Sequence, residues 1–120
     1  MKPGTAKAKG RETENQAVGW LRRWWPNAER RRLAGIEDQG DIAGIPSVCI
    51  EVKSAAQWKP VQWLRECEVE RENAQAELAF VMARPKGGTN VDDWVIMMTP
   101  DQLIELLDQA DWLPRQSKLG

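Results

Sequence analysis

The sequence predicts a single α/β domain in which a mixed central sheet of about five strands is flanked by helices. Segments with helical and strand-like patterns follow one another as helix, three strands, helix, two strands and helix, an order typical of a mixed sheet covered by helices. The chain has 120 residues, enough for one hydrophobic core and too few for two ordinary domains. We therefore expect one domain over residues 11–113, between a flexible basic arm, 1–10, and a loose tail, 114–120.

The first helix is predicted over residues 13–25. Apolar side chains recur there at helical spacing, and Pro26 ends the pattern. Glu14 stands at the head of the apolar stripe that should face the core. A carboxylate in that position needs a partner, although the helix dipole alone also favours an acidic residue in a first turn.

The next three segments are predicted strands, over the ranges 28–34, 41–45 and 47–53. In the last of them, alternation places Glu51 and Lys53 side by side on one face and apolar side chains on the other. A hairpin through Gly44 and Pro46 would bring Asp41 beside Glu51.

The second half of the chain is predicted to contain a helix, two strands joined by a basic loop, and a last helix that starts at Thr99 or Pro100. The helix is predicted over residues 60–75, the two strands over 78–83 and 94–98, and the loop between them over 84–90. The charges on the 60–75 helix are expected to form a solvated, ion-paired face, made by Arg65, Glu66, Glu68, Glu70, Arg71 and Glu72. The apolar side of the last helix is expected to comprise Leu103, Ile104, Leu106 and Leu107.

The composition excludes several kinds of chemistry, because the chain contains no histidine and no tyrosine. The chain therefore lacks a residue required by serine and cysteine hydrolases that use histidine, by histidine-containing zinc sites and by tyrosine recombinases. The 2 cysteines cannot form a four-thiolate zinc site, and we expect both to be reduced in a cytosolic compartment. Catalysis would therefore rely on carboxylates, lysine, arginine, serine or a hard metal ion.

Charge is distributed unevenly, although the net charge is only −1. Residues 1–32 contain nine Lys and Arg against three Glu, whereas the remainder has eight basic and fifteen acidic residues. A basic segment on an otherwise acidic chain suggests a surface for a polyanion, although flexible basic tails also serve solubility alone. No apolar run approaches the length that crosses a bilayer, and no signal peptide is evident, so we expect no membrane association.

The strongest chemical signal is the group formed by Asp41, Glu51 and Lys53. Two neighbouring carboxylates repel one another, and a hard divalent metal bound through oxygen ligands relieves that repulsion. Lys53 could then hold or help to activate a water or a phosphate oxygen. A strand with charges on one face is more often simply a solvent-facing strand, so the group needs support from the rest of the chain.

That support comes from the order of the motifs, which resembles the PD-(D/E)xK nuclease superfamily. Within it, the chain is most similar to archaeal-type Holliday-junction resolvases and their phage relatives. The similarity covers about residues 9–55 and comprises Lys9-Gly10 followed by Glu14, Gly40-Asp41, and Ile50-Glu51-Val52-Lys53. Gly40 replaces the proline of the superfamily name, and the serine that often lies in the loop before the aspartate is missing.

The resemblance implies a restriction-endonuclease-like fold and a Mg²⁺-dependent endodeoxyribonuclease, in which Mn²⁺ would be able to substitute. It assigns Asp41 and Glu51 as metal ligands, with the backbone carbonyl of Val52 as a further ligand. Glu14 would complete the metal environment directly or through water. Lys53 would orient or deprotonate the attacking water and stabilise charge in the transition state.

Branched or duplex DNA is the partner that this resemblance implies. Candidates for phosphate contacts are Lys9, Arg11, Arg30, Arg31, Arg32, Arg84 and Lys86, for which ordinary surface charge is an equal alternative. A resolvase cuts two strands symmetrically, which calls for a homodimer, and it would work in the cytoplasm of a prokaryotic or phage-infected cell. Two other interpretations stay open: a nicking or repair endonuclease acting on duplex or flap DNA, and a non-catalytic DNA-binding protein whose charged group is an ion-paired surface.

Overall fold

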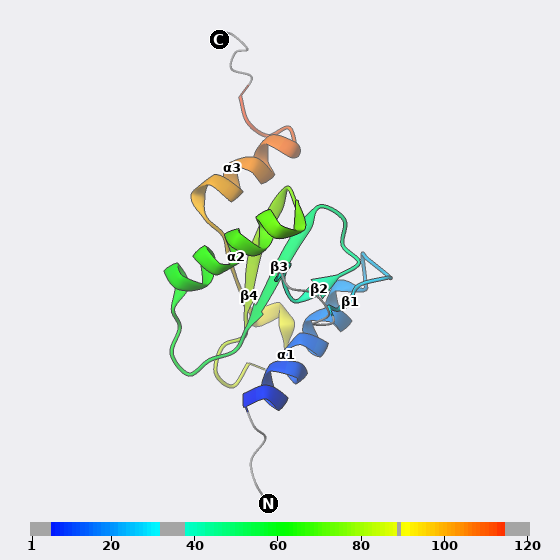
Figure 1. Cartoon of the computed structure of the whole chain (residues 1–120), viewed down its shortest axis with the longest axis vertical. Helices are drawn as coiled ribbons and strands as arrows, with labels where there is room; N and C mark the ends of the chain where they lie inside the picture. The colour runs from blue at the N-terminus through cyan, green and yellow to red at the C-terminus, as the bar shows by residue number, and fades with distance from the viewer. Residues whose placement is uncertain (1–5, 32–37, 89, 115–120) are drawn as a thin grey trace, which may run out of the picture.

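A computed structural model describes residues 6–31, 38–88 and 90–114 of the chain (Figure 1). The elements, in chain order, are α1 (Ala6–Leu21), β1 (Glu29–Arg30), β2 (Ile42–Ala43), β3 (Val48–Lys53), α2 (Pro60–Ala74), β4 (Leu78–Ala83), the 3₁₀-helix η1 (Val91–Asp93), β5 (Val95–Met97) and α3 (Pro100–Gln109). The predicted mixed α/β character is confirmed. None of these helices combines the length and the apolar character needed to span a membrane.

The strands form two sheets instead of the single sheet of about five strands that the sequence predicts. β4 is the middle strand of the larger sheet, parallel to β3 and antiparallel to β5. β1 and β2 form a separate antiparallel pair of two residues each. The chain does turn back before β3, since the Asp41 N–H donates to the Ile50 carbonyl at 3.0 Å, but within the described residues β2 pairs only with β1.

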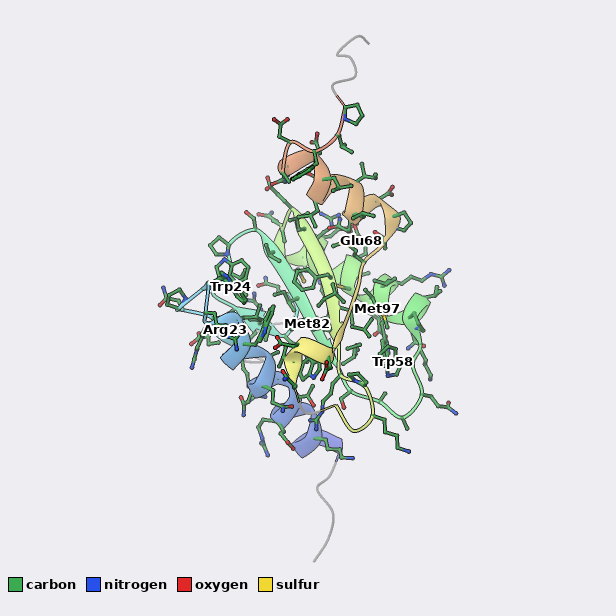
Figure 2. The ribbon with its side chains drawn as sticks, turned by 180° about the vertical axis from the view of Figure 1, so that it is seen from behind. Arg23, Trp24, Trp58, Glu68, Met82 and Met97 are labelled. Carbon is green, nitrogen blue, oxygen red and sulfur yellow. The ribbon has the colours of Figure 1, made fainter. Side chains whose placement is uncertain are left out.

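Helices α1 and α2 cover opposite faces of the β3–β4–β5 sheet. α2 crosses in front of β3 and β4 in Figure 1. The core on the α1 side is formed by Ala17, Val18, Leu21, Ala28, Ile42, Ile45, Ile50, Val52, Met82 and Trp94. The core on the α2 side is formed by Cys49, Trp63, Cys67, Ala76, Ala79, Val81 and Ala83. Met82 belongs to the first cluster, whereas Met97 on the neighbouring strand packs against the second (Figure 2). Alternation along β3 thus distributes successive side chains between two separate cores.

The ends of α1 differ from the prediction. The helix begins at Ala6, inside the segment expected to be a flexible arm, and it ends at Leu21, before the expected Trp25. The alternating alanines and lysines of residues 6–9 are good helix formers, which explains the earlier start. Residues 1–5 and 115–120 of the expected arm and tail lie outside the described chain, as does 32–37 of the expected strand 28–34.

The last helix is anchored by a polar residue instead of by its apolar side. Thr99 caps α3, because its hydroxyl accepts from the Gln102 N–H at 3.1 Å. Gln102 is itself buried, and its side-chain oxygen accepts from the Ala79 N–H at 2.7 Å. This hydrogen bond satisfies a backbone donor near the start of β4. Three residues of the predicted apolar side of α3 are exposed, since Leu103, Ile104 and Leu106 are 44%, 50% and 39% accessible to solvent.

Candidate active site

A glycine positions the first acidic residue of the candidate site. Gly40 adopts a φ of 94°, and a Cβ built at this position would lie 2.8 Å from the Cys49 sulfur. Only glycine combines this backbone conformation with so close an approach to β3. Its N–H donates to the Asp38 side chain at 3.0 Å, which fixes the turn and delivers Asp41 to the edge of β3.

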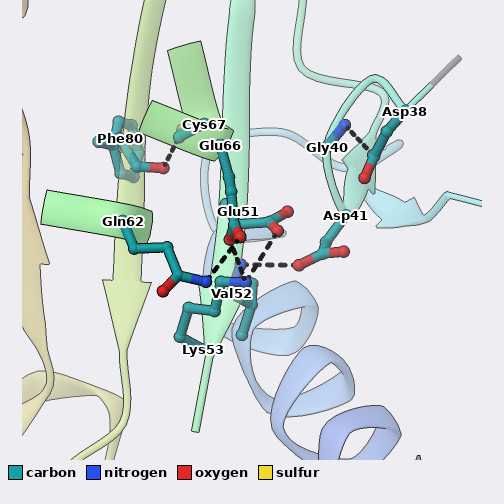
Figure 3. Close-up of polar contacts among 10 residues, drawn as sticks. All are labelled: Asp38, Gly40, Asp41, Glu51, Val52, Lys53, Gln62, Glu66, Cys67 and Phe80. Carbon is teal, nitrogen blue, oxygen red and sulfur yellow. Dashed lines mark hydrogen bonds and ion pairs between the residues drawn. The ribbon is translucent and has the colours of Figure 1, made fainter. Parts of the chain in front are cut away.

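Asp41 is bound to β3 through both its backbone and its side chain. The Asp41 N–H donates to the Ile50 carbonyl at 3.0 Å, and the Val52 N–H donates to the Asp41 carboxylate at 2.8 Å (Figure 3). On the other side, the Arg31 N–H donates to the Asp41 carbonyl at 2.8 Å. The aspartate is therefore held rigidly beside β3, as the sequence predicts.

Glu51 and Lys53 extend from β3 toward α2, on one face of the strand. Glu51 is only 7% exposed, and one of its carboxylate oxygens has no hydrogen-bond partner among the described residues. The Lys53 ammonium lies 3.4 Å from the other Glu51 oxygen and 3.3 Å from the Glu66 carboxylate on α2 (Figure 3). α2 therefore covers Glu51, while Lys53 stays partly exposed.

The carboxyl groups of Asp41 and Glu51 lie near one another beside β3 (Figure 3). Burial, together with the charges of Asp41 and Glu70, raises the pKa of Glu51 to about 10. Burial also raises the pKa of Asp41, against the opposing effect of the Val52 hydrogen bond. Two ionised carboxylates are thus unfavourable here without a further positive charge.

Lys53 supplies one such charge. Burial lowers the pKa of its ammonium, but the Glu51 and Glu66 carboxylates outweigh this effect, so the pKa is raised overall. The pKa of Glu66 is lowered by the hydrogen bond from Gln62 and by Lys53. Lys53 is therefore a cation at neutral pH, suited to stabilising negative charge on a bound group.

Glu14 lies close to this group but has a partner of its own. Its carboxylate accepts from the Arg30 guanidinium at 2.9 Å, although its charge still contributes to raising the pKa of Asp41. Within the described residues, no three acidic or cysteine side chains converge closely enough to hold a metal ion. The structure thus brings Asp41, Glu51 and Lys53 together and places Glu14 at their margin.

A residue that the sequence analysis placed on a solvated face belongs to this region. Glu70 is only 4% exposed, and one of its oxygens has no hydrogen-bond partner among the described residues. Burial and the neighbouring Asp38 carboxylate raise its pKa to about 8. The signal was present in the helical spacing, because Trp63, Cys67 and Glu70 form the buried stripe of α2.

The candidate DNA contacts fall into two groups. Lys9, Arg84 and Lys86 line a hollow of about 260 Å³ that also includes Ser54, directly after β3. Arg84 is held there, donating to the Gly88 carbonyl at 2.7 Å and to the Gln16 side chain at 2.9 Å.

The other candidates lie apart from this hollow. Arg11 is exposed, and Arg30 is engaged by Glu14. Arg31 turns back to donate to the Gln39 side chain at 3.2 Å and to the Ile42 carbonyl at 3.3 Å. Arg32 lies outside the described residues.

Comparison with known proteins yields no relative: no protein-family model matches the chain, and no curated protein or solved structure matches it either. The chemistry of the site therefore carries the functional argument. A buried and a partly buried carboxylate, with one Glu51 oxygen that has no hydrogen-bond partner among the described residues, fit a hard divalent cation such as Mg²⁺. Mg²⁺ prefers oxygen ligands and is commonly bound through one or two carboxylates and waters.

Proposed function

We propose that this protein is a metal-dependent endonuclease that hydrolyses phosphodiester bonds in branched DNA, as a Holliday-junction resolvase does. One observation carries the proposal: the buried Glu51 carboxyl lies beside the partly buried Asp41 carboxyl, with the Lys53 ammonium 3.4 Å from Glu51 (Figure 3). Burying two carboxylates costs free energy unless a cation compensates. A fold that maintains this arrangement is best explained by a function that requires it.

Asp41 and Glu51 would hold Mg²⁺ or Mn²⁺ through their carboxylate oxygens, with the Val52 carbonyl as the further ligand that the motif implies. The bound ion would polarise the phosphate and lower the pKa of a coordinated water. The hydrogen bond from the Val52 N–H fixes the Asp41 carboxylate, so that its orientation is set before the ion binds. Glu14 would contribute only after releasing Arg30.

Lys53 would act on the scissile phosphate and the attacking water. Its ammonium remains protonated at neutral pH, because two carboxylates raise its pKa. It would therefore donate hydrogen bonds to a phosphate oxygen and stabilise the negative charge that develops there during hydrolysis. Its position two residues after Glu51 on the same strand keeps it next to the carboxylates.

The hollow beyond β3 would bind the DNA backbone next to the end of the strand that carries Glu51 and Lys53. Its cationic residues, Lys9, Arg84 and Lys86, lie around Ser54, the residue that follows Lys53. Contacts of this kind position the phosphate backbone without reading base sequence, which suits recognition of DNA shape. Cutting both strands of a junction would require two such sites, and hence a homodimer.

The proposal is tested by incubating the purified protein with end-labelled four-way junctions, flaps and plain duplexes, in Mg²⁺, in Mn²⁺ and in chelator. We expect paired, symmetric cuts in the junction only when metal is present. The Asp41→Asn variant should bind the junction and leave it intact.

The alternatives predict other outcomes. Equal cleavage of plain duplex would replace the resolvase assignment with that of a nicking or repair endonuclease. Binding without cleavage of any substrate in either metal would contradict the nuclease proposal and favour a DNA-binding protein.

A further inference from the structure

We propose that Asp38 and Glu70 form a second divalent-cation site, adjacent to the Asp41–Glu51 pair and reached from a hollow beneath α2 that Glu51 and Lys53 also line. This site is absent from the sequence pattern on which the nuclease proposal is based. It does not depend on nuclease activity, because cation binding can be measured without DNA.

Glu70 provides the first observation. The helical stripe that begins with Trp63 and Cys67 carries Glu70 into the interface with the sheet, where it is 96% buried. One of its carboxylate oxygens is inaccessible to solvent and has no hydrogen-bond partner among the described residues. A buried carboxylate oxygen without a donor strongly favours a bound cation or a proton.

Asp38 is brought to Glu70 by α2 itself. The Asn73 side-chain amide, one helical turn after Glu70, donates to the Asp38 carbonyl at 2.8 Å. The Gly40 N–H fixes the Asp38 side chain from the other direction at 3.0 Å. These two contacts hold Asp38 near Glu70, and both residues line one hollow.

The hollow next to this pair is strongly acidic. It has a volume of about 440 Å³ and is lined by Asp38, Glu51, Lys53, Glu66, Val69 and Glu70. Its one cation, Lys53, is engaged by Glu51 and Glu66 at 3.4 and 3.3 Å. Within the described part of the chain, no basic side chain forms an ion pair with Asp38 or Glu70. The charge of the pair must therefore be balanced by a proton or by a bound cation.

The geometry favours a partly hydrated ion over a fully enclosed one. No three described acidic side chains surround a single point closely, so a cation that needs a complete protein cage is unsuited. Mg²⁺ and Mn²⁺ accept one or two carboxylates and retain several waters, for which a hollow of about 440 Å³ leaves room. Glu51, which lines the same hollow and also lies beside Asp41, would lie between the two ions.

The experiment is a Mn²⁺ titration of the full chain without DNA, followed by calorimetry and by electron paramagnetic resonance of free Mn²⁺. We expect the wild type to bind two ions per chain. Glu70→Gln and Asp38→Asn should each bind one ion normally and the other about tenfold or more weakly. Asp41→Asn should retain the ion at Asp38 and Glu70, which separates the two sites.

Glu68→Gln is the matched control. It removes a carboxylate from the same helix, but one that pairs with Arg71 and does not line the hollow, so Mn²⁺ binding should be unchanged. Circular dichroism and urea unfolding verify that each variant folds, and Asp38→Asn alters an exposed residue whose amide oxygen can still accept from the Gly40 N–H.

Unchanged Mn²⁺ stoichiometry and affinity in both Asp38→Asn and Glu70→Gln would overturn the proposal. A gain in stability of these variants without any change in Mn²⁺ binding would also overturn it, since the pair would then share a proton instead of a cation. A wild type that binds two ions but cleaves no DNA would leave this site standing and remove only the nuclease proposal.

Discussion

The two faces of the β3–β4 sheet differ in what they bury. Toward α1, β3 contributes Ile50 and Val52 to a cluster of apolar side chains. Toward α2, the same strand contributes Glu51, which is buried together with Glu70 beside the Cys49 and Cys67 thiols. Ile50 on one face and Glu51 on the other are both buried, so burial alone does not distinguish these two positions. Both faces carry an apolar core, but the α2 face also contains carboxyl groups whose burial opposes folding and which we assign to cation-dependent chemistry.

The largest expected effect comes from disrupting the α1 face. Ile50 is fully buried, so Ile50→Ala should lower the free energy of unfolding by about 2 to 5 kcal/mol through lost burial and a residual cavity. Urea denaturation measures this. The control is Val69→Ala, at an α2 position that is 58% exposed, where the change should stay within about 0.5 kcal/mol. Equal effects at the two positions would show that the α1 face is not the stabilising core.

On the α2 face, the next largest effect is expected on catalysis. Lys53→Ala removes the cation beside Glu51 and should slow junction cleavage about 10²- to 10³-fold in single-turnover assays. The reason is that the negative charge developing on the phosphate would lose the hydrogen-bond donor that stabilises it. Lys59→Ala changes an exposed lysine before α2 and should leave the rate unchanged. Wild-type cleavage by Lys53→Ala would exclude a direct role for this lysine.

Glu51 should make the free energy of unfolding depend on pH in the opposite sense to that expected from a typical acidic residue. The pKa of Glu51 is raised from 4.5 to about 10 in the folded chain, so its contribution to stability is complete below pH 4.5 and is lost as the pH rises toward 10. In chelator at neutral pH, Glu51→Gln should therefore raise the free energy of unfolding by roughly 1 to 3 kcal/mol.

Urea denaturation across the range from about pH 5 to pH 9 measures this, and the wild type should lose stability steadily while Glu51→Gln loses less. The control Glu68→Gln should follow the wild-type curve, since the Glu68 side chain is 38% exposed and paired with Arg71. Parallel curves for wild type and Glu51→Gln would mean that Glu51 is stably ionised, contrary to its assignment as an unfavourable buried acid.

The smallest effect is expected at the basic hollow. Lys86 is exposed at its rim, so Lys86→Ala should weaken junction binding less than tenfold, by about 1 kcal/mol, and reduce the salt dependence of affinity by about one phosphate contact. Fluorescence anisotropy at several salt concentrations measures both quantities. An unchanged salt dependence would place the DNA elsewhere.

Local patterns predicted the central elements of this fold well. β3, α2 and β4 lie close to the predicted ranges, because each has a clear apolar period and a clear boundary, such as Pro60 at the start of α2. The division into two sheets was not predictable, because strand pairing depends on contacts between distant residues. The exposure of the apolar side of α3 was not predictable for a related reason. Amphipathic spacing shows which side of a helix is apolar, but not whether that side packs against a core.

The candidate site was predictable where neighbouring residues determine it. Alternation along β3 places Glu51 and Lys53 together, and the Gly40 turn delivers Asp41 to them. Glu70 was missed because its segment was interpreted by charge content, although its spacing from Cys67 already indicated burial. The pairing of Glu14 with Arg30 is long-range and has no local signal.

The most direct test of the central claim is the single-turnover rate of four-way-junction cleavage by Glu51→Gln in Mg²⁺, compared with that of wild type. Glu51 is a proposed metal ligand whose burial lowers the stability of the fold. We therefore expect Glu51→Gln to be at least as stable as wild type and to bind the junction. We expect it to cleave the junction at least about 10²-fold more slowly. A folded Glu51→Gln protein that cleaves at the wild-type rate would contradict the account, as would a wild type with no metal-dependent cleavage at all.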